Sequence, residues 1–199
     1  METYLGLPLY YLDVDDTVEG VSIVSIVDFP AVESDFLKFS KDDKEEPMKF
    51  SYDDERHIIT GVALIPEKRI YRRSYSDGYE YYVTFTKEAI ERIVEKFFRD
   101  FKATNVNLEH SEMTEACVIF ESYLLDKERN IAPKEFADMP DGTWLISMKV
   151  NDRALWDDIK AGKYNGFSVE GLLRIEEEPA PEIKEFDNLE DLLDYLKDN

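Results

Sequence analysis

Apolar and polar residues alternate with the two-residue period of β-strands through most of the chain. Strand-like runs rich in β-branched and aromatic residues occur at residues 20–32, 56–65, 69–75, 79–85, 105–110, 116–126, 143–150 and 166–175. Two segments have helical spacing instead. One follows Thr86 to about residue 102, with Phe101 on its apolar side, and the other runs from Asn151 to Gly162. Strands interrupted by two helices predict an α+β fold.

Charged segments divide the chain into three predicted parts. The run Ser-Lys-Asp-Asp-Lys-Glu-Glu-Pro at 40–47 is a plausible linker. It separates an acidic N-terminal segment with one apolar strand (1–45) from a central domain (46–177). The remaining residues, 178–199, begin as a Pro-containing acidic linker and end in an amphipathic helix at 188–197.

The net charge of −21 lies almost entirely at the two ends of the chain. Residues 1–55 carry a net charge of −11 and residues 176–199 carry −8, whereas the middle is nearly balanced. Acidic ends repel nucleic acid, so we expect no nucleic-acid partner. No apolar run is long enough to cross a membrane, and the N-terminus has no secretory-signal pattern, so we expect neither a membrane site nor secretion.

Cofactor and metal chemistry has no support in the sequence. The chain lacks a glycine-rich phosphate loop, paired cysteines, zinc-type histidine spacing and an EF-hand loop. Its single cysteine, Cys117, lies in an apolar strand and is expected to be a buried, inert thiol. The Tyr71–Tyr75 stretch, with two arginines, is interpreted as a strand with one solvated face. We therefore predict no cofactor and no metal.

Two strand segments, 105–110 and 166–171, carry residues suited to nucleophilic catalysis. Ser168 and Glu170 fall on the polar face of the second segment, and Gly166 and Gly171 would let another backbone approach closely. His110 shares a face with apolar residues at the end of the first segment. Histidine is the usual base that activates a serine. The pattern alone leaves open that the serine is an ordinary strand residue and the histidine a core residue.

The order of several motifs adds a family resemblance. These motifs are residues 24–31 (VSIVDFPA), 61–66 (GVALIP), 70–72 (IYR), 107–110 (NLEH), 142–144 (GTW) and 162–168 (GKYNGFS). Together, over residues 20–175, they resemble the phage prohead (capsid maturation) proteases, most closely the XkdF-like group of phage serine proteases. The resemblance implies a β-barrel-like, mostly antiparallel sheet flanked by helices, as in herpesvirus assemblin. It also implies that Ser168 is the nucleophile and His110 the general base, within hydrogen-bond reach of each other.

A third residue is needed to orient the histidine, and the sequence offers alternatives. Glu121 lies in register with apolar residues of its strand, where a carboxylate is costly unless it is paired. We therefore favour Glu121 over Glu170 as the residue that orients the histidine. Glu170 suits contact with the substrate at least as well as this orienting role, and Gly166 and Gly171 are expected to contact the substrate with it. His57 comes too early in the chain to match the second histidine of assemblin. A dyad without a third member stays open.

The implied function is a serine endopeptidase of capsid maturation. The expected substrates and partners are the phage scaffold protein, extensions of the major capsid protein and the protease itself. The expected location is the interior of the prohead in the host cytoplasm. The alternative is a non-enzymatic head-assembly protein that uses the same fold as a packing module.

Overall fold

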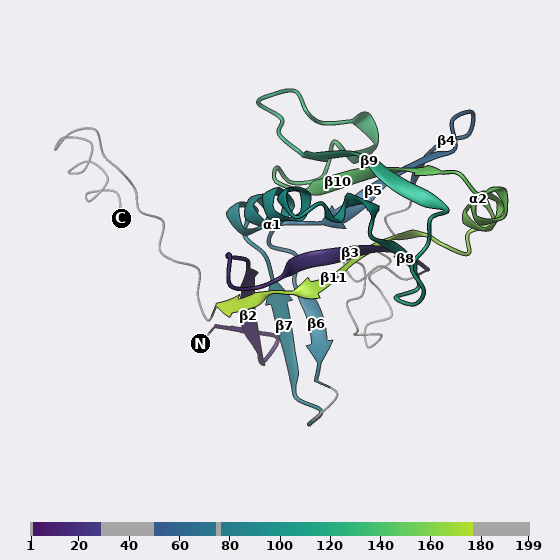
Figure 1. Ribbon diagram of the computed structural model, residues 1–199. Coiled ribbons are helices and arrows are strands. Elements are labelled where there is room, and N and C mark those ends of the chain that lie inside the picture. The colour runs from purple at the N-terminus through teal and green to yellow at the C-terminus, as the bar shows by residue number, and fades with distance from the viewer. Residues whose placement is uncertain (1, 29–49, 75–76, 177–199) are drawn as a thin grey trace.

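The computed structural model of the chain describes residues 2–28, 50–74 and 77–176, which form three β-sheets and two α-helices (Figure 1). One sheet contains five strands in the order β1-β2-β7-β6, with β12 also paired to β2. Its strands are β1 (Thr3–Tyr4), β2 (Leu7–Asp13), β6 (Ile70–Arg73), β7 (Glu80–Thr84) and β12 (Arg174–Glu176). The β6–β7 hairpin projects away from the rest of the molecule.

The second sheet is antiparallel and contains four strands in the order β4-β5-β10-β9. They are β4 (Ser51–Asp53), β5 (Ile58–Leu64), β9 (Cys117–Leu124) and β10 (Trp144–Val150). The central strand β10 is paired with β5 on one side and β9 on the other and is almost completely buried.

The third sheet positions the candidate catalytic residues. It contains three strands in the order β11-β3-β8, which are β3 (Gly20–Val27), β8 (Val106–Leu108) and β11 (Gly166–Leu172). Strand β3 lies in the middle, antiparallel to β11 and parallel to β8. Residues far apart in the sequence are therefore brought into one row across this sheet.

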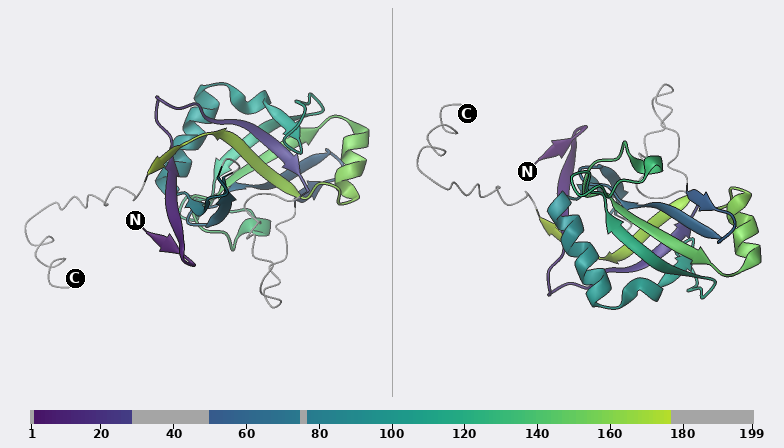
Figure 2. Two further views of the ribbon diagram at one scale, coloured as in Figure 1. Left: turned by 90° about the horizontal axis from the view of Figure 1, so that it is seen from below. Right: turned by 90° about the horizontal axis from the view of Figure 1, so that it is seen from above.

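The two helices lie at opposite ends of the described structure in every view (Figure 2). They are α1 (Lys87–Arg99) and α2 (Arg153–Lys160), and short 3₁₀ turns occur at Lys102–Thr104 and Lys134–Phe136. The predicted cap Thr86 is confirmed, because its side chain accepts a hydrogen bond from the Ala89 amide at 3.1 Å.

Three details at the helix ends differ from the prediction or refine it. Asp152, not Asn151, caps α2, because its carboxylate accepts a hydrogen bond from the Leu155 amide. Helix α1 ends at Arg99, and Phe101 adopts a positive φ of 57° and is exposed rather than inward-facing. Gly162, at φ 79°, follows the last turn of α2, where a residue without a Cβ is favoured.

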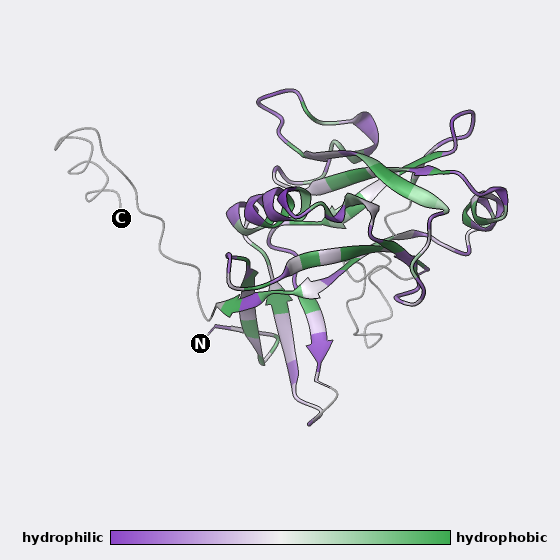
Figure 3. Cartoon of the chain, in the orientation of Figure 1, coloured by the Kyte–Doolittle hydropathy of each residue, from purple (hydrophilic) through white to green (hydrophobic). Residues whose placement is uncertain are grey.

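One apolar core joins the sheets and α1. It includes aromatic contacts: Phe97 of α1 packs edge-on against Trp144 of β10, and Phe50 packs against Phe167 of β11. Hydrophobic segments follow the strands, whereas loops and the outer sides of the helices are hydrophilic (Figure 3). Cys117 belongs to this core, and burial raises the pKa of its thiol to about 12, as expected for an inert cysteine.

The α+β class is confirmed, but the barrel-like closure is wrong. A closed barrel needs every strand to be paired on both sides. Here the strands divide among three separate sheets, whose edges are formed by strands such as β4, β8 and β11. The likeness to assemblin in fold stays a prediction.

The N-terminal residues are part of the same structural unit as the predicted central domain. Strand β3 pairs with β11 and β8, and β2 pairs with β7 and β12. The predicted boundary at residue 45 therefore cuts through two sheets. The predicted C-terminal helix at 188–197 lies outside the described residues.

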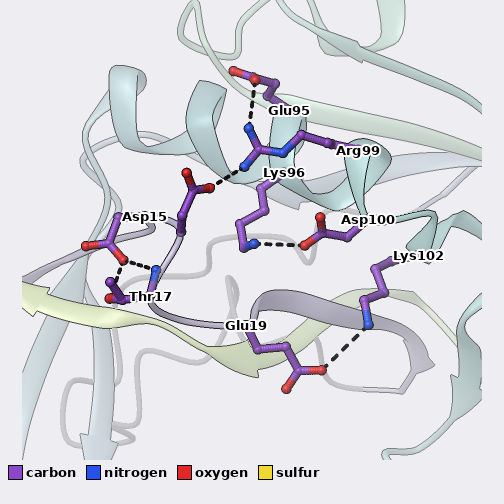
Figure 4. A network of polar contacts seen from close by, with 9 residues as sticks. Asp15, Thr17, Glu19, Glu95, Lys96, Arg99, Asp100 and Lys102 are labelled. Carbon is purple, nitrogen blue, oxygen red and sulfur yellow. Dashed lines mark hydrogen bonds and ion pairs between the residues drawn. The ribbon is translucent and has the colours of Figure 1, made fainter.

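Ion pairs join the connection between β2 and β3 to the C-terminal end of α1 and the turn that follows it (Figure 4). Arg99 of α1 contacts Asp16 at 2.7 Å, and Lys102 contacts Glu19 at 3.7 Å. Such exposed pairs each contribute at most about 1 kcal/mol. The N-terminal acidic residues described here thus partly neutralise basic residues of this helix end.

Candidate active site

A row of three polar residues crosses the three-stranded sheet. Ser25 on β3 is paired directly with Ser168 on β11 and with Asn107 on β8. Directly paired residues project from the same face of a sheet. All three side chains are buried: Ser25 is 0% exposed, Ser168 3% and Asn107 2%. Polar residues at buried strand positions need hydrogen-bond partners.

His110 reaches this row through a turn rather than through the strand alternation that the sequence predicts. Strand β8 ends at Leu108, and Glu109 and His110 then adopt positive φ values of 50° and 54°. These left-handed residues redirect the chain, so the imidazole does not continue on the face of Val106 and Leu108. It lies instead beside Ser25 and Glu170.

Glu170 is the centre of the polar network. One carboxylate oxygen, Oε1, accepts hydrogen bonds from Ser25 Oγ and Asn107 Nδ2, both at 2.7 Å. The same oxygen lies 3.0 Å from His110 Nδ1, which is also 3.1 Å from Ser25 Oγ. Three residues from three strands or turns are therefore held on a single carboxylate oxygen.

These contacts define the tautomer of His110. The Ser25 hydroxyl directs its proton to the Glu170 carboxylate, so its oxygen is left to accept from the imidazole. Nδ1 must then carry the proton, which it shares between Ser25 and Glu170. The other nitrogen, Nε2, is the basic one in this tautomer, and it has no hydrogen bond to a described residue.

The electrostatics of Glu170 favour its ionised form. Burial raises the pKa of Glu170, but the hydrogen bonds from Ser25, Asn107 and His110 together outweigh it and lower the pKa below its ordinary value. A carboxylate that stays ionised beside Nδ1 can orient the imidazole and stabilise its protonated form.

Ser168 opens onto a cavity of about 530 Å³. The cavity lies between β11 and the sheet that contains β6 and β7, and Glu170 and Gly171 also line it. No hydrogen bond joins Ser168 to His110 among the described residues, contrary to the expectation from the sequence. The reason is topological, because β3 separates β11 from β8 and Ser25 stands between the two side chains.

Gly171, near Ser168 on β11, serves packing within the chain. A Cβ at Gly171 would lie 2.0 Å from the backbone oxygen of Gly20 and 2.7 Å from Val21 Cα. The close backbone approach that the sequence predicts for this glycine is therefore made by β3. Gly166 is buried and begins β11, opposite Val27. Contact of Gly166, Glu170 and Gly171 with a substrate stays a prediction.

Glu121 does not orient His110 in this structure. It lies on β9, in the four-stranded sheet opposite Ser147, and is exposed. A register shift beside Phe120 breaks the alternation on which the prediction relied, so Glu121 leaves the apolar face. The carboxylate on His110 is Glu170, which was the second choice from the sequence. His57 is elsewhere, stacked on Trp156.

Ser25 and Asn107 were not identified from the sequence as site residues. Both belong to segments used for the family resemblance, and each alternates with apolar residues on its strand. A buried polar residue at such a position is a signal of a hydrogen-bond network. Their convergence with Glu170 depends on the pairing of three strands, which the sequence pattern does not specify.

Other kinds of site find no support within residues 2–28, 50–74 and 77–176. No group of three or more His, Cys, Asp or Glu side chains in this part of the chain is arranged to hold a metal ion. None of the helices that the structure describes is long and apolar enough to span a membrane.

The comparisons with known proteins agree with the resemblance read from the motifs. A family model described as "Putative phage serine protease XkdF" matches residues 47–177. The chain is 28% identical over 169 residues to the phage-like element PBSX protein XkdF of Bacillus subtilis (strain 168), a match that covers 80% of this chain. The aligned part is 55% of that relative's length. No solved structure matches the chain.

Proposed function

Because the chain belongs to the XkdF-like group of phage serine proteases, we propose that it is a serine endopeptidase in which Ser168 is the nucleophile and His110 the general base. The observation that carries the proposal is the hydrogen-bonded set of His110 and Glu170 beside a serine that lines a cavity. A carboxylate on Nδ1 leaves Nε2 as the base, which is the arrangement that acyl transfer from serine requires.

The proposed reaction has two stages, acylation of Ser168 and hydrolysis of the acyl-enzyme. Ser168 Oγ bonds to the scissile carbonyl carbon, and its proton passes to His110 Nε2. The imidazolium then gives that proton to the leaving amine as the peptide bond breaks, and water repeats both steps to release the acyl group. Proton transfer requires Nε2 to come within hydrogen-bond distance of Ser168 Oγ, and Ser25 cannot relay the proton, because its hydroxyl contacts Nδ1 instead. Catalytic hydrogen bonds commonly tighten only when substrate binds.

Ser25 is the competing nucleophile, because its hydroxyl contacts the histidine directly. Three observations favour Ser168. Ser25 is completely buried and its proton is held by Glu170. Ser168 opens onto the cavity. The matched family region, 47–177, includes Ser168 and excludes Ser25. We assign Ser25 and Asn107 as positioning residues that hold Glu170.

The biological setting extends this proposal. The matched relative is named as a protein of a phage-like element. We propose that the substrates are the scaffold protein, extensions of the major capsid protein and the protease itself. Cleavage would occur inside the prohead in the host cytoplasm.

The first prediction concerns which serine reacts. A fluorophosphonate probe should label the purified chain once, at Ser168, as located by peptide mass spectrometry. Ser168→Ala and His110→Ala should each abolish labelling, and the double variant should be hardly worse than either single one, because nucleophile and base act as a unit. Ser25→Ala is the matched control and should retain labelling at Ser168 at a reduced rate.

The same experiment separates the alternatives. Labelling at Ser25 would reassign the nucleophile. Two observations favour a non-enzymatic head-assembly role: Ser168 is only 3% exposed, and no hydrogen bond joins it to His110 among the described residues. If no serine is labelled in a folded chain, this packing role replaces the protease.

A further inference from the structure

Arg72 is the one strongly cationic side chain among the described residues that line the Ser168 cavity. It lies on β6 opposite Tyr81 of β7, and both residues line the cavity. Its neighbour Arg73 points the other way and is exposed. The rest of the lining is largely apolar, with Ile70, Val83 and Phe85 among its members.

This guanidinium lacks an acidic partner in the described part of the chain. Nη1 donates a hydrogen bond to the Tyr71 carbonyl at 3.0 Å, whereas a guanidinium has five N–H donors. Glu170 lines the same cavity, but its Oε1 is occupied by Ser25, Asn107 and His110. Burial lowers the pKa of Arg72, which is the sign of a cation that has lost water without gaining a counter-ion.

We propose that this cavity is the substrate cleft of the Ser168 site, and that Arg72 binds a side-chain carboxylate of the peptide that is cleaved. The inference rests on the proposed protease function and adds the class of substrate to it, namely peptides with an acidic residue close to the scissile bond. A guanidinium fork matches a carboxylate with two parallel hydrogen bonds.

The position of Ser168 explains why one peptide can meet both groups. Strand β11 is an edge strand, so its outer backbone is free of a partner strand in the described sheet and faces the cavity. A peptide laid along this edge would pass Ser168 and present alternate side chains toward the β6–β7 face, where Arg72 lies. The chain's own acid-rich ends contain sequences of this class.

The test uses the full-length protein and a mixture of random-sequence peptides with blocked termini, so that every carboxylate belongs to a side chain. Cleavage sites are read by mass spectrometry. We expect Asp or Glu to be enriched at one position near the cleaved bond. Matched peptides with Glu or Gln at that position should then differ about 10- to 100-fold in kcat/KM, the range for a charge-assisted hydrogen bond.

Variants assign this preference to Arg72. Arg72→Gln should remove the difference between the Glu and Gln peptides while retaining fluorophosphonate labelling of Ser168. Arg72→Lys should keep the preference in part, since it retains the charge. Arg73→Gln is the matched control, one residue away on the exposed face, and should cleave like the parent. A melting temperature for each variant separates loss of binding from loss of fold.

Two results would overturn the inference, and they differ from each other. Labelling and cleavage without acidic preference, or a preference that survives in folded Arg72→Gln, would refute the role of Arg72 and leave the protease proposal standing. Absence of both labelling and cleavage would refute the proposed function and this inference with it. A preference only for peptides with a free C-terminal carboxylate, tested with unblocked peptides, would reassign the cleft to chain ends.

Discussion

At the scale of single residues, the site depends on one carboxylate oxygen. Glu170 Oε1 receives Ser25 and Asn107 and lies against His110 Nδ1, so its loss would release three groups at once. A residue that orients a catalytic histidine acts on the rate of the chemical step rather than on substrate binding. Glu170 and Glu121 therefore form a natural pair of test positions.

The second prediction is that Glu170→Gln lowers kcat by about 10²- to 10⁴-fold, because the amide neither fixes the Nδ1–H tautomer nor stabilises the imidazolium. Glu121→Gln, an exposed glutamate on β9, should change kcat by less than about twofold. Steady-state kinetics on one cleaved peptide measures both variants. Equal activity of Glu170→Gln and the parent would remove Glu170 from the mechanism.

The third prediction follows from the lowered pKa of Glu170, whose ordinary value is near 4.5. A carboxyl whose pKa is depressed by folding stabilises the protein fully above its unfolded-state pKa, and that contribution is lost as the pH falls through the folded-state value. The parent should therefore exceed Glu170→Gln in free energy of unfolding by about 1–2 kcal/mol at neutral pH. The difference should shrink below pH 4.5.

Urea unfolding of both proteins from neutral to acidic pH measures this difference. Glu121→Gln, as the control, should stay within about 0.5 kcal/mol of the parent across the range. A difference between parent and Glu170→Gln that grows on acidification would contradict the assigned direction.

At the scale of elements, the contact between β11 and β3 decides whether the site forms. The two strands pair along their whole length, and a register shift lies between Glu170 and Gly171. At that point Gly171 packs directly on the backbone of Gly20 and Val21. Glu170 is the last residue before this shift, and its carboxylate reaches across β3 to Asn107 on β8.

The fourth prediction is that Gly171→Ala destabilises the protein by about 1–3 kcal/mol or more, since the added Cβ must push β11 away from β3. Peptide cleavage should fall by more than the loss of folded protein accounts for, because Glu170 moves with the strand. Leu172→Ala, at the exposed next position, should cost less than about 0.5 kcal/mol. Denaturant unfolding and peptide cleavage of both variants provide the comparison, and a stable, fully active Gly171→Ala would show that the strands separate without consequence.

At the scale of the whole molecule, the acidic N-terminal part contributes strands β2 and β3 to the sheets of the fold. Strand β3 is the centre of the sheet that carries Ser168, Ser25 and Asn107. Without it, β11 and β8 would have no common partner and their buried residues would be exposed to water. The matched family region begins at residue 47, after this strand.

The fifth prediction compares two truncations. The fragment 47–199 should fail to fold, as judged by the absence of a cooperative thermal transition, because it lacks β2 and β3. The fragment 1–177 should melt cooperatively and cleave peptides nearly as well as the full chain does. We expect it to be less efficient than the full chain in incorporation into proheads or in self-processing. A folded, active 47–199 fragment would show that β3 is dispensable, and an inactive but folded 1–177 would place the C-terminal segment in the active site.

Local elements and the chemical types of the candidate residues could be predicted from short stretches of the sequence. Strand β10, helix α1 with its Thr86 cap, and the buried state of Cys117 follow from periodicity, capping chemistry and hydrophobicity over short segments. The family resemblance, too, rests on residues in a fixed order along the chain, and the family match confirms it.

Which of these residues come into contact depends on how the strands pair and turn in three dimensions. Two left-handed residues turn His110 onto Ser25, and a register shift on β9 removes Glu121 from the apolar face. The insertion of β3 between β8 and β11 places Ser25 between Ser168 and His110. Strand order, bulges and turns arise from long-range pairing, and a one-residue change in register moves a side chain to the other face of a sheet. Alternation read along a single segment cannot contain that information.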